Sequence, residues 1–285
     1  MYKDIVKNNI SEIIKLHFSE KVPLAKISIK FLKKKERYHA ISSYLKEIGY
    51  TPLSFSETHR RGKNNKSVNI DYFKEIDSHE KAYWLGFLYA DGSVIYKGSK
   101  PVKIVLGLKE RDPIEAFKRA IKSNNKVCEY DIFDKRTLKS YKRYCINICS
   151  MDFASHVINL GLKGKSKCAD FPKIDERFFF DFLRGLFDGD GSVMDSRISF
   201  LGTNKIIEYI KNKLISDYSI SETKTIVRYQ FDDGQLCQFN IYKNKEKEKI
   251  YKLLYKDSTA ETRLKRKYEK FNKILSQRLN SESGH

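Results

Sequence analysis

Two aspartates occupy matched places in the sequence, and their surroundings make them the strongest candidates for chemistry. Asp91 lies near the end of EIDSHEKAYWLGFLYADGSV, and Asp190 lies near the end of KIDERFFFDFLRGLFDGDGSV. Each segment has Ile-Asp near its start, continues through an aromatic-rich stretch, and closes on a small residue followed by Asp-Gly-Ser-Val. Hard divalent cations such as Mg²⁺ prefer carboxylate and carbonyl oxygens as ligands. One helix that ends in Asp-Gly is common, but two at matched positions indicate a divalent-metal site.

A helix is the element that must position each aspartate. Asp77 with Glu80 three residues later resembles a capping box, and Asp175 is placed to cap the second helix. The stretch AYWLGFLYA is apolar around most of its circumference, so this helix is expected to be buried on more than one side. Gly92 and Gly191 are well placed as the C-terminal caps of the two helices.

Small residues four positions apart indicate that the two motif helices pack against each other. A glycine inside a helix costs about 1 kcal/mol relative to alanine, and close approach of two backbones is a reason to keep it. The pairs are Gly86 with Ala90 and Gly185 with Gly189. Packing across a pseudo-twofold axis brings the two aspartates to the negative ends of two helix dipoles, where carboxylates are unfavourable. Stability does not explain that concentration of negative charge, whereas bound divalent cations do.

The aspartate segments belong to a longer internal repeat. A strand that turns into a helix follows each one, as KIVLGLKERDPIEAFKRAI in the first copy and RISFLGTNKIIEYIKNKL in the second. Further strands are predicted at 127–133 and 141–149, and at 225–231 and 236–242. A second helix closes each copy, at 152–160 and 245–255. The order in each half is α-β-β-α-β-β-α, which makes the chain a duplicated domain of the α+β class.

The charge of the chain narrows the class of partner. Its 285 residues carry 56 Lys plus Arg against 36 Asp plus Glu, a formal charge of +20 at pH 7. Such an excess favours a polyanion, with nucleic acid first and an acidic membrane surface second. The apolar stretch 82–90 is far shorter than the roughly 20 residues that a membrane span needs. Eighteen Tyr and eighteen Phe argue against disorder.

The cysteines and the first residues bear on the compartment. Five Cys, an odd number with no CxxC pair, argue against a disulfide framework or a structural zinc site and fit a reducing compartment. The start MYKDIVKNNISEII lacks the apolar core of a signal peptide. We therefore expect an intracellular protein, in the cytoplasm of a bacterial or phage-infected cell or in an organelle matrix, and not a secreted one.

The two motif stretches resemble those of a known family. WLGFLYADG and LRGLFDGDG are similar to the two motifs of a single-chain LAGLIDADG homing endonuclease, and the resemblance extends to KAYWLGFLYADGSV and LKRKYEKF over roughly residues 72–272. It implies two pseudo-symmetric αββαββα halves whose sheets form a saddle that straddles duplex DNA. It also implies that both strands are cut across the minor groove, leaving four-base 3′ overhangs.

The resemblance also implies a ligand set for metal. The last Asp of each motif, Asp91 or Asp190, binds divalent metal over the scissile phosphates in this family, and the carbonyls of Ala90 and Gly189 are the expected further ligands. Two or three Mg²⁺ or Mn²⁺ ions are expected to be shared between the two aspartates. Metals in such sites polarise the phosphate, generate hydroxide and stabilise the leaving 3′ oxygen.

The first motif departs from the family pattern at one position. Tyr89 stands where the second motif keeps Asp188. The family does not use this position as a metal ligand, so the change is expected to make the two half-sites unequal and not to remove activity.

The resemblance further implies one basic residue per half, usually Lys, near the catalytic water. We expect Lys165 and Lys267 to have this catalytic role, each from a K-x-K run that also contains Lys163 or Lys265. A solvated basic loop explains any single one of these lysines equally well.

Alternation along the strands predicts which side chains face DNA. Apolar residues of strands 141–149 and 236–242 are expected to face inward, which leaves Arg, Gln and Asn side chains outward. These types suit bidentate contacts with guanine or adenine in the major groove. The predicted contacts are Lys103, Arg143, Asn147, Arg197, Arg228, Gln230, Gln238, Asn240 and Tyr242. The alternative is an exposed sheet face that is polar without binding DNA.

Residues 1–50 lie outside the repeat. Helices are predicted at 11–18, 24–31 and 38–48, and a Lys-rich turn before the last makes the segment resemble a helix-turn-helix module whose last helix enters the major groove. The alternative is a small helical bundle that docks on the core. The predicted DNA contacts of this module are Lys33, Lys34, Lys35, Arg37 and His39. Arg60, Arg61 and Lys63 follow in a basic linker that is expected to track the DNA backbone.

These patterns divide the chain into five parts. They are a helix-turn-helix-like domain at 1–50, a linker at 51–71, LAGLIDADG-like halves at 72–172 and 173–275, and a tail at 276–285. We expect a monomer that acts as a pseudo-dimer on double-stranded DNA, with no membrane partner. The expected function is a site-specific, Mg²⁺-dependent DNA endonuclease of a mobile genetic element. A non-cutting DNA-binding regulator or an RNA splicing maturase on the same scaffold is the alternative, and a small-molecule phosphate hydrolase leaves the DNA-facing strands unexplained.

Overall fold

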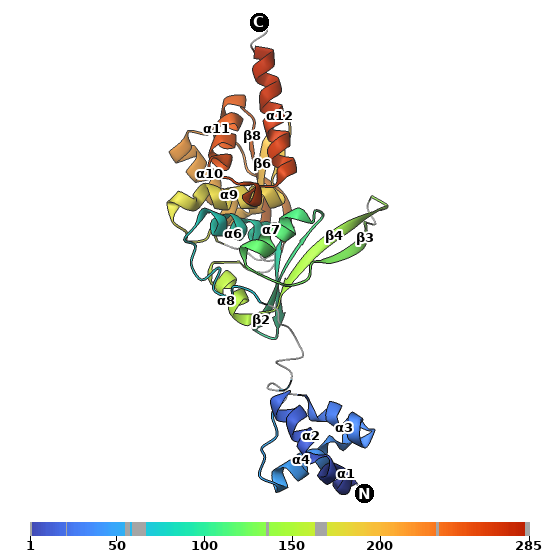
Figure 1. Ribbon diagram of the computed structural model, residues 1–285. Coiled ribbons are helices and arrows are strands. Elements are labelled where there is room, and N and C mark those ends of the chain that lie inside the picture. The colour runs from blue at the N-terminus through green and yellow to red at the C-terminus, as the bar shows by residue number, and fades with distance from the viewer. Residues whose placement is uncertain are drawn as a thin grey trace. The chain divides into compact units, whose positions relative to one another are not determined.

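The structure is a computed structural model that describes residues 2–20, 22–54, 58, 67–134, 137–162, 170–231 and 234–282. The chain divides into two units, Met1–Ser67 and Val68–His285 (Figure 1). Each unit has its own hydrophobic core. None of the helices in these ranges is long and apolar enough to cross a membrane.

The small unit is helical. It consists of α1 (Tyr2–Asn8), α2 (Ile10–Ile14) continued by a π-helical turn (Lys15–Ser19), α3 (Leu24–Leu32), a 3-10 turn (Lys35–Arg37) and α4 (Tyr38–Glu47). Its core is formed by apolar side chains at helical spacing, namely Val6, Ile13, Ile27, Leu32, Ile41 and Leu45. Three helices were predicted in this region, and α1 is an additional one. Lys33 ends α3 in the left-handed conformation, with φ of 61°.

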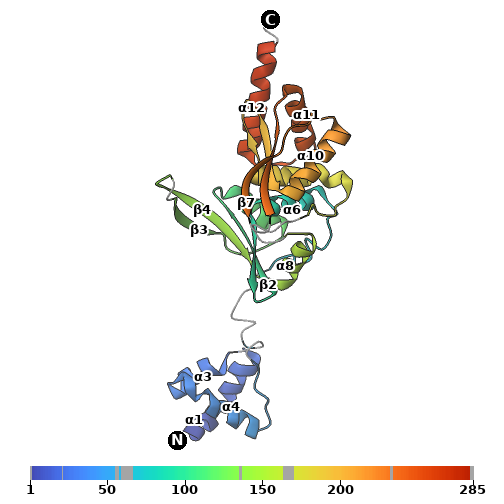
Figure 2. The same ribbon diagram turned by 180° about the vertical axis from the view of Figure 1, so that it is seen from behind.

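The large unit contains two copies of the predicted order α-β-β-α-β-β-α (Figure 2). The first copy comprises α6 (His79–Asp91), β1 (Gly92–Lys97), β2 (Lys100–Leu108), α7 (Asp112–Ala120), β3 (Cys128–Asp134), β4 (Lys139–Ile148) and α8 (Met151–Asn159). The second comprises α9 (Phe179–Asp190), β5 (Ser192–Val193), β6 (Ile198–Thr203), α10 (Asn204–Tyr218), β7 (Ile226–Phe231), β8 (Gly234–Ile241) and α11 (Asn244–Tyr255). The prediction of a duplicated α+β fold is therefore confirmed.

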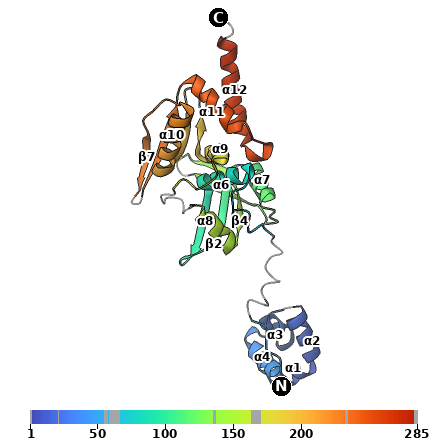
Figure 3. The same cartoon turned by 90° about the vertical axis from the view of Figure 1, so that its left-hand side faces the viewer.

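Each half builds one four-stranded antiparallel sheet. The strand orders are β1-β2-β4-β3 and β5-β6-β8-β7, so the two sheets have the same topology. Ile104, Ile146 and Ile148 alternate along β2 and β4 and are buried in the core. Helices α7 and α8 pack on the first sheet and α10 packs on the second (Figure 3). One face of each sheet is thus covered by helices, which leaves the other face for function.

Helices α6 and α9 pack along their main chains, as the small residues predicted. A Cβ added to Gly86 would lie 2.0 Å from the carbonyl oxygen of Phe182, and one added to Gly185 would lie 2.0 Å from that of Tyr83. The two contacts are symmetric, because each glycine faces the residue three positions before the other. Only glycine fits at either position, and the absent side chains let the two helices touch backbone to backbone.

The caps of these helices differ in part from the prediction. Ser78, and not Asp77, is the N-cap of α6, and its hydroxyl accepts a hydrogen bond from the amide of Lys81 at 3.4 Å. Asp77 instead forms an ion pair with the Lys81 side chain at 2.9 Å. Asp175 accepts from the amide of Arg177 and begins the 3-10 turn (Glu176–Phe178) that leads into α9. Because a capping carboxylate and a capping hydroxyl were adjacent in the first motif, the pattern placed the start one residue early.

Gly92 and Gly191 are the C-terminal caps of α6 and α9, as predicted. Gly92 and Gly191 have φ of −74° and −73°, so neither adopts the left-handed conformation of a common C-terminal glycine. A Cβ on Gly92 would lie 2.4 Å from the carbonyl oxygen of Leu88, and one on Gly191 would lie 2.6 Å from that of Phe187. The chain therefore turns sharply from helix into strand, with no room for a side chain.

One further helix follows the second copy. Helix α12 (Lys265–Glu282) extends into the residues predicted to form a tail, 276–285. Phe271 and Ile274, three residues apart, bury its apolar stripe in the core of the large unit. The stripe is narrow and charged residues surround it, which is why the pattern did not indicate a helix. Its first turn carries Lys267.

Candidate metal centre and nucleic-acid interface

Asp91 and Asp190 end two helices that are in contact. Gly189 precedes Asp190 in α9, and a Cβ on Gly189 would lie 2.2 Å from the Cβ of Ala90 and 2.9 Å from Oδ2 of Asp91. The carboxylate of Asp91 therefore lies against the last turn of the opposite motif helix. Asp91 is half-buried and Asp190 is exposed. The structure thus brings the two predicted ligand pairs, each a carboxylate with the preceding carbonyl, to adjacent helix ends.

Lys267 lies at the end of α9. Its Nζ donates to the carbonyl oxygens of Phe187 at 2.6 Å, Gly191 at 2.5 Å and Gly189 at 3.4 Å. Burial lowers the pKa of Lys267 to about 8, against the opposing effect of carboxylates that include Asp190 and Asp91. The ammonium group therefore neutralises the negative end of the helix, and it already contacts the Gly189 carbonyl that the resemblance assigns to metal.

Asp188 holds the chain segment that carries Lys267. Its Oδ2 accepts from the amide of Leu264 at 2.7 Å and from the hydroxyl of Tyr83 at 3.1 Å. Burial raises the pKa of Asp188 to about 6, and the nearby charge of Lys267 opposes that rise. The other oxygen, Oδ1, is buried and has no hydrogen-bond partner among the described residues. Asp188 thus connects the motif helix to the start of α12.

Tyr89, at the matching position of the first half, holds the matching connector in another way. Its hydroxyl donates to the carbonyl oxygen of Leu160, just after α8, at 2.5 Å. Gly161 beside it has φ of +100°, and a Cβ there would lie 2.5 Å from the Tyr89 hydroxyl oxygen. The two halves therefore differ at this position, with a carboxylate that accepts in one and a phenol that donates in the other.

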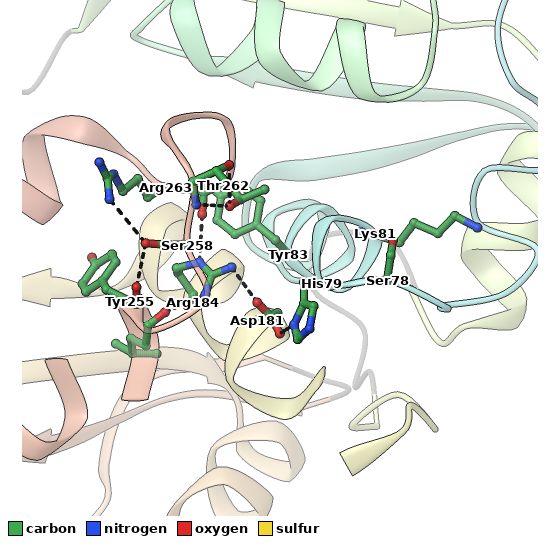
Figure 4. Close-up of polar contacts among 12 residues, drawn as sticks. Ser78, His79, Lys81, Tyr83, Asp181, Arg184, Tyr255, Ser258, Thr262 and Arg263 are labelled. Carbon is green, nitrogen blue, oxygen red and sulfur yellow. Dashed lines mark hydrogen bonds and ion pairs between the residues drawn. The ribbon is translucent and has the colours of Figure 1, made fainter. Parts of the chain in front are cut away.

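A buried polar network lies in the second half and reaches the first half at His79 (Figure 4). Arg184, which is 1% exposed, donates to the carbonyls of Thr262 at 2.8 Å and Leu254 at 2.6 Å, and to Oδ1 of Asp181 at 2.6 Å. The other oxygen of Asp181 lies 2.7 Å from Nδ1 of His79 at the start of α6. The Leu254 carbonyl belongs to the last turn of α11 and the Thr262 carbonyl to the connector between α11 and α12, so this network fixes the path of the chain toward Lys267.

The sequence contains a signal from which this network could have been predicted. Asp181 and Arg184 are an acid and a base three residues apart inside an otherwise apolar helix. Charged residues are almost never fully buried unless they are paired. The corresponding positions of the first motif are Ala82 and Leu85, so the second half contains a network that the first half lacks.

A cavity of about 550 Å³ lies beside Asp91. It is bounded by the ends of α6 and α9, by β2 and β4, and by the first turn of α12. The charged side chains around it include Asp91, Lys109, Glu110, Arg143, Asp188 and Arg266. The lining thus contains three cationic side chains, from the residue after β2, from β4 and from α12, together with three carboxylates.

The donors at the helix ends suit a hard cation. Carboxylate oxygens of Asp91 and Asp190 and the neighbouring carbonyls of Ala90 and Gly189 form an all-oxygen set, which Mg²⁺ and Mn²⁺ accept. Within the ranges that the structure describes, no three His, Cys, Asp or Glu side chains gather as a ligand group. An ion here would therefore complete its coordination with water or with oxygens of the substrate.

The first sheet presents the predicted polar face. Lys103, Arg143 and Asn147 lie on the face opposite the buried Ile104 and Ile146, and all three are partly exposed. In the second half, Arg228, Gln230 and Tyr242 are exposed. These six positions are accessible to a bound duplex.

The prediction for Gln238 and Asn240 needs correction. They are only 7% and 1% exposed, because their amides bond within the sheet. Gln238 Nε2 donates to Asn240 Oδ1 at 2.5 Å and to the hydroxyl of Ser199 at 3.0 Å, and Arg228 Nε donates to Gln238 Oε1 at 2.5 Å. Neither amide is available for direct base contact in this arrangement. Arg197, also predicted to contact DNA, is half-buried, and its Nε has no partner in the described part of the chain.

The remaining predicted contacts lie in or near the small unit or outside the described residues. Lys33, Lys34 and Lys35 are exposed between α3 and α4, and His39 is exposed in the first turn of α4. The Arg37 side chain makes contacts within the small unit. It donates to the carbonyl of Leu32 at 2.8 Å, and its guanidinium lies 4.1 Å from the ring centre of Tyr2. The positions outside the described residues are Arg60, Arg61, Lys63, Lys163 and Lys165.

Comparisons with known proteins find similarity in structure and none in sequence. No family model and no curated protein matches the chain. The homing endonuclease I-WcaI bound to its DNA recognition sequence aligns with 78% of this chain and 96% of its own, at 13% identity and a TM-score of 0.48. I-DmoI in complex with DNA and Ca aligns with 68% and 93%, at 16% identity and a TM-score of 0.41.

A third solved structure is similar to the chain. Full-length DUF199/WhiA from Thermatoga maritima aligns with 74% of this chain and 66% of its own, at 18% identity and a TM-score of 0.41. At these identities the similarity concerns the arrangement of elements, and the function has to be argued from the residues of this chain.

Proposed function

We propose that the chain is a site-specific, divalent-metal-dependent DNA endonuclease that breaks both strands of a duplex and leaves four-base 3′ overhangs. The observation that carries this proposal is the meeting of the Asp91 and Asp190 helix ends beside Lys267. Two carboxylates at two negative helix ends are unfavourable by themselves. Divalent cations between those carboxylates and the phosphates of a substrate offset that repulsion and give the arrangement a use.

The residues at the helix ends have distinct roles in this proposal. Asp91 and Asp190, with the carbonyls of Ala90 and Gly189, hold the ions. When bound, these ions polarise the phosphate and lower the pKa of a coordinated water. Lys267 holds the carbonyls at the end of α9 in place and adds a positive charge next to the reacting phosphate. The chain has two motif aspartates, one for each strand of a duplex that is to be cut.

Duplex DNA is the proposed substrate because of charge and shape. The net charge of +20 favours a polyanion, and much of the affinity for DNA comes from neutralised phosphates. Each sheet has a face without helices, and exposed Arg, Lys, Asn and Gln side chains on these faces are of the types that read base edges. The small unit supplies further exposed lysines, and we propose that it lengthens the contact with DNA.

One observation favours a second candidate, a non-cutting DNA or RNA binder on the same scaffold. Lys267 contacts the Gly189 carbonyl at 3.4 Å, and a metal that uses this oxygen must share it or displace the lysine. A protein that only binds nucleic acid would keep the lysine where it is. Metal-dependent cleavage separates the two candidates.

The test is a cleavage selection from a randomised duplex library with Mg²⁺, repeated with Ca²⁺ and with a chelator. Endonuclease activity predicts fragments with a common sequence at both ends and overhangs of one length, in the Mg²⁺ arm only. The variants Asp91→Asn and Asp190→Asn should each lower double-strand cleavage by about 100-fold or more, since loss even of groups that only orient metal ligands costs 10–100-fold. Both should still bind the selected site, because no contact to DNA bases is removed.

Two results would contradict the endonuclease proposal. One is binding of a selected site without cleavage in any metal, which supports the second candidate. The other is undiminished cutting by both asparagine variants, which would place the active site elsewhere in the chain.

A further inference from the structure

Three cationic side chains from three elements surround the cavity beside Asp91. Lys109 follows β2, Arg143 lies in β4 and Arg266 lies in the first turn of α12. Lys109 Nζ lies 4.3 Å from the ring centre of Tyr141, and Arg143 donates to the carbonyl of Gly107 at 3.3 Å. Both contacts position a cation without neutralising it, since an aromatic ring and a carbonyl carry no net charge.

Glycine at position 107 is part of this arrangement. A Cβ there would lie 2.9 Å from Nε of Arg143. Its absence leaves room for the guanidinium of Arg143, which lines the cavity, to lie against β2.

Arg266 differs from the other two because it is neutralised. Its Nε forms an ion pair with Glu110, which comes from the first half, whereas α12 follows the second half. The two side chains are 58% and 41% exposed, and exposed ion pairs of this kind contribute little to stability. A phosphate offers a guanidinium the same two-oxygen geometry as a carboxylate. A phosphate can therefore replace Glu110 as the partner of Arg266 at a small cost in free energy.

We propose that this cavity is a binding site for one backbone phosphate of DNA, and that Glu110 occupies Arg266 as an internal competitor until DNA arrives. The inference rests on the proposed function, since it names a phosphate of the same duplex. Lys109, Arg143 and Arg266 receive the phosphate, and Glu110 turns away to solvent. The contact between the halves through Glu110 and Arg266 is thus exchanged for one through DNA.

The aligned positions of the other half do not carry the same charges. By the alignment of the repeats, the second half has Thr203 and Asn204 where the first has Lys109 and Glu110, and Gly164 stands where the second has Arg266. None of these three residues carries a charge. The competitor therefore acts on one of the two DNA strands only.

The test measures binding of a labelled random-sequence duplex in Ca²⁺ at several salt concentrations. Four proteins are compared: the wild type, Glu110→Gln, Arg266→Ala and the double variant. Removing the competitor should tighten binding by up to about fivefold, the change expected when an exposed ion pair no longer opposes the contact. Arg266→Ala should weaken binding and reduce the salt slope by about one. In the Arg266→Ala background, Glu110→Gln should have no effect, because its partner is gone.

Glu269→Gln is the matched control. Glu269 is an exposed carboxylate on α12 that lies 3.8 Å from Lys265, and it does not line the cavity beside Asp91. Equal tightening by Glu269→Gln and Glu110→Gln would overturn the proposal, since charge alone would then explain it. So would an effect of Glu110→Gln that persists without Arg266. If the wild type binds no duplex, the proposed function itself is refuted. If the wild type binds and Glu110→Gln binds with the same affinity, only the proposed phosphate site is refuted.

Strand specificity gives a second readout. With each strand of a cleaved duplex labelled separately, Glu110→Gln should change the cutting rate of one strand and leave that of the other unaltered. Equal changes on both strands would show that Glu110 does not act through a single phosphate.

Discussion

At the scale of single residues, the contact between the two halves depends on side chains that are missing. Gly86 and Gly185 lie where any side chain would enter the carbonyl of the opposite helix. A methyl group there cannot be accommodated by a rotamer change, because the obstructing atoms are main chain. Either the helices separate or the residue is glycine.

Gly185→Ala should therefore lower the free energy of unfolding by about 3 kcal/mol, the upper end of the range for an overpacked core. Urea unfolding followed by circular dichroism measures this change. Gly202→Ala is the matched control, since a Cβ at this buried β6 position would lie 3.6 Å from its nearest neighbours and should change stability by no more than about 1 kcal/mol. Similar stability of the two variants would show that α6 and α9 do not touch as described.

The environment of a side chain can be predicted from the sequence when it depends on residues nearby in the chain. The two motif aspartates were found because a repeated pattern marks them. Gln238 and Asn240 were assigned to the correct strand but to the wrong environment, since alternation shows which face a side chain is on and not whether neighbours cover it. Their partner Ser199 lies on another strand of the sheet, 39 and 41 residues away in the sequence. A pattern within one strand does not predict a contact between residues so far apart.

At the scale of elements, the motif helices have two tasks, and only one of them was visible in the sequence. Their small residues predict the contact with each other. Their second task is to hold the connectors after α8 and α11, and they do so with different side chains in the two halves. The buried charges of α9 are the clearest difference.

Arg184→Leu, which copies Leu85 of the first motif, should destabilise the fold by about 3–5 kcal/mol, because it leaves the Asp181 carboxylate and two carbonyls buried without their partner. The double variant Asp181→Ala with Arg184→Leu, which copies both first-half residues, should be more stable than Arg184→Leu alone, since it also removes a buried carboxylate whose remaining side-chain contact is the half-exposed His79. Urea unfolding of the three proteins measures this. A double variant less stable than the single one would mean that the contact with His79 outweighs the cost of burying Asp181.

Most element boundaries followed from periodicity, and the failures have specific causes. Strands predicted at 141–149 and 236–242 are observed at Lys139–Ile148 and Gly234–Ile241. The register shift between Val227 and Tyr229 could not be predicted, because a bulge depends on the strand opposite. Helices α1 and α12 were missed because a short or highly charged segment becomes a helix through what it packs on, and not through its own pattern.

At the scale of the whole molecule, the excess of positive charge is divided among parts that fold separately. The small unit has its own core of six buried apolar residues and carries exposed lysines at 33, 34 and 35 in the turn before α4. Its removal leaves the core of the large unit intact, since neither core contains residues of the other. This separation makes its contribution to binding measurable.

Deleting residues 2–50 should weaken DNA binding by at least about tenfold and reduce the steepness of its salt dependence by roughly three, one for each lost lysine contact. The position of the cut should not move, because the aspartates lie in the large unit. Titration of a labelled duplex at several salt concentrations, with mapping of the ends, measures both. Unchanged affinity would show that the small unit does not contact DNA.

The backbone contact at Gly86 and Gly185 has a consequence for how such a protein can diversify. The spacing of the two aspartates is fixed by peptide groups, which are the same whatever the side chains around them. Residues on the open faces of the sheets can therefore change without altering this spacing. If the proposed function holds, the recognised target can diversify while the distance along DNA between the two cuts stays constant.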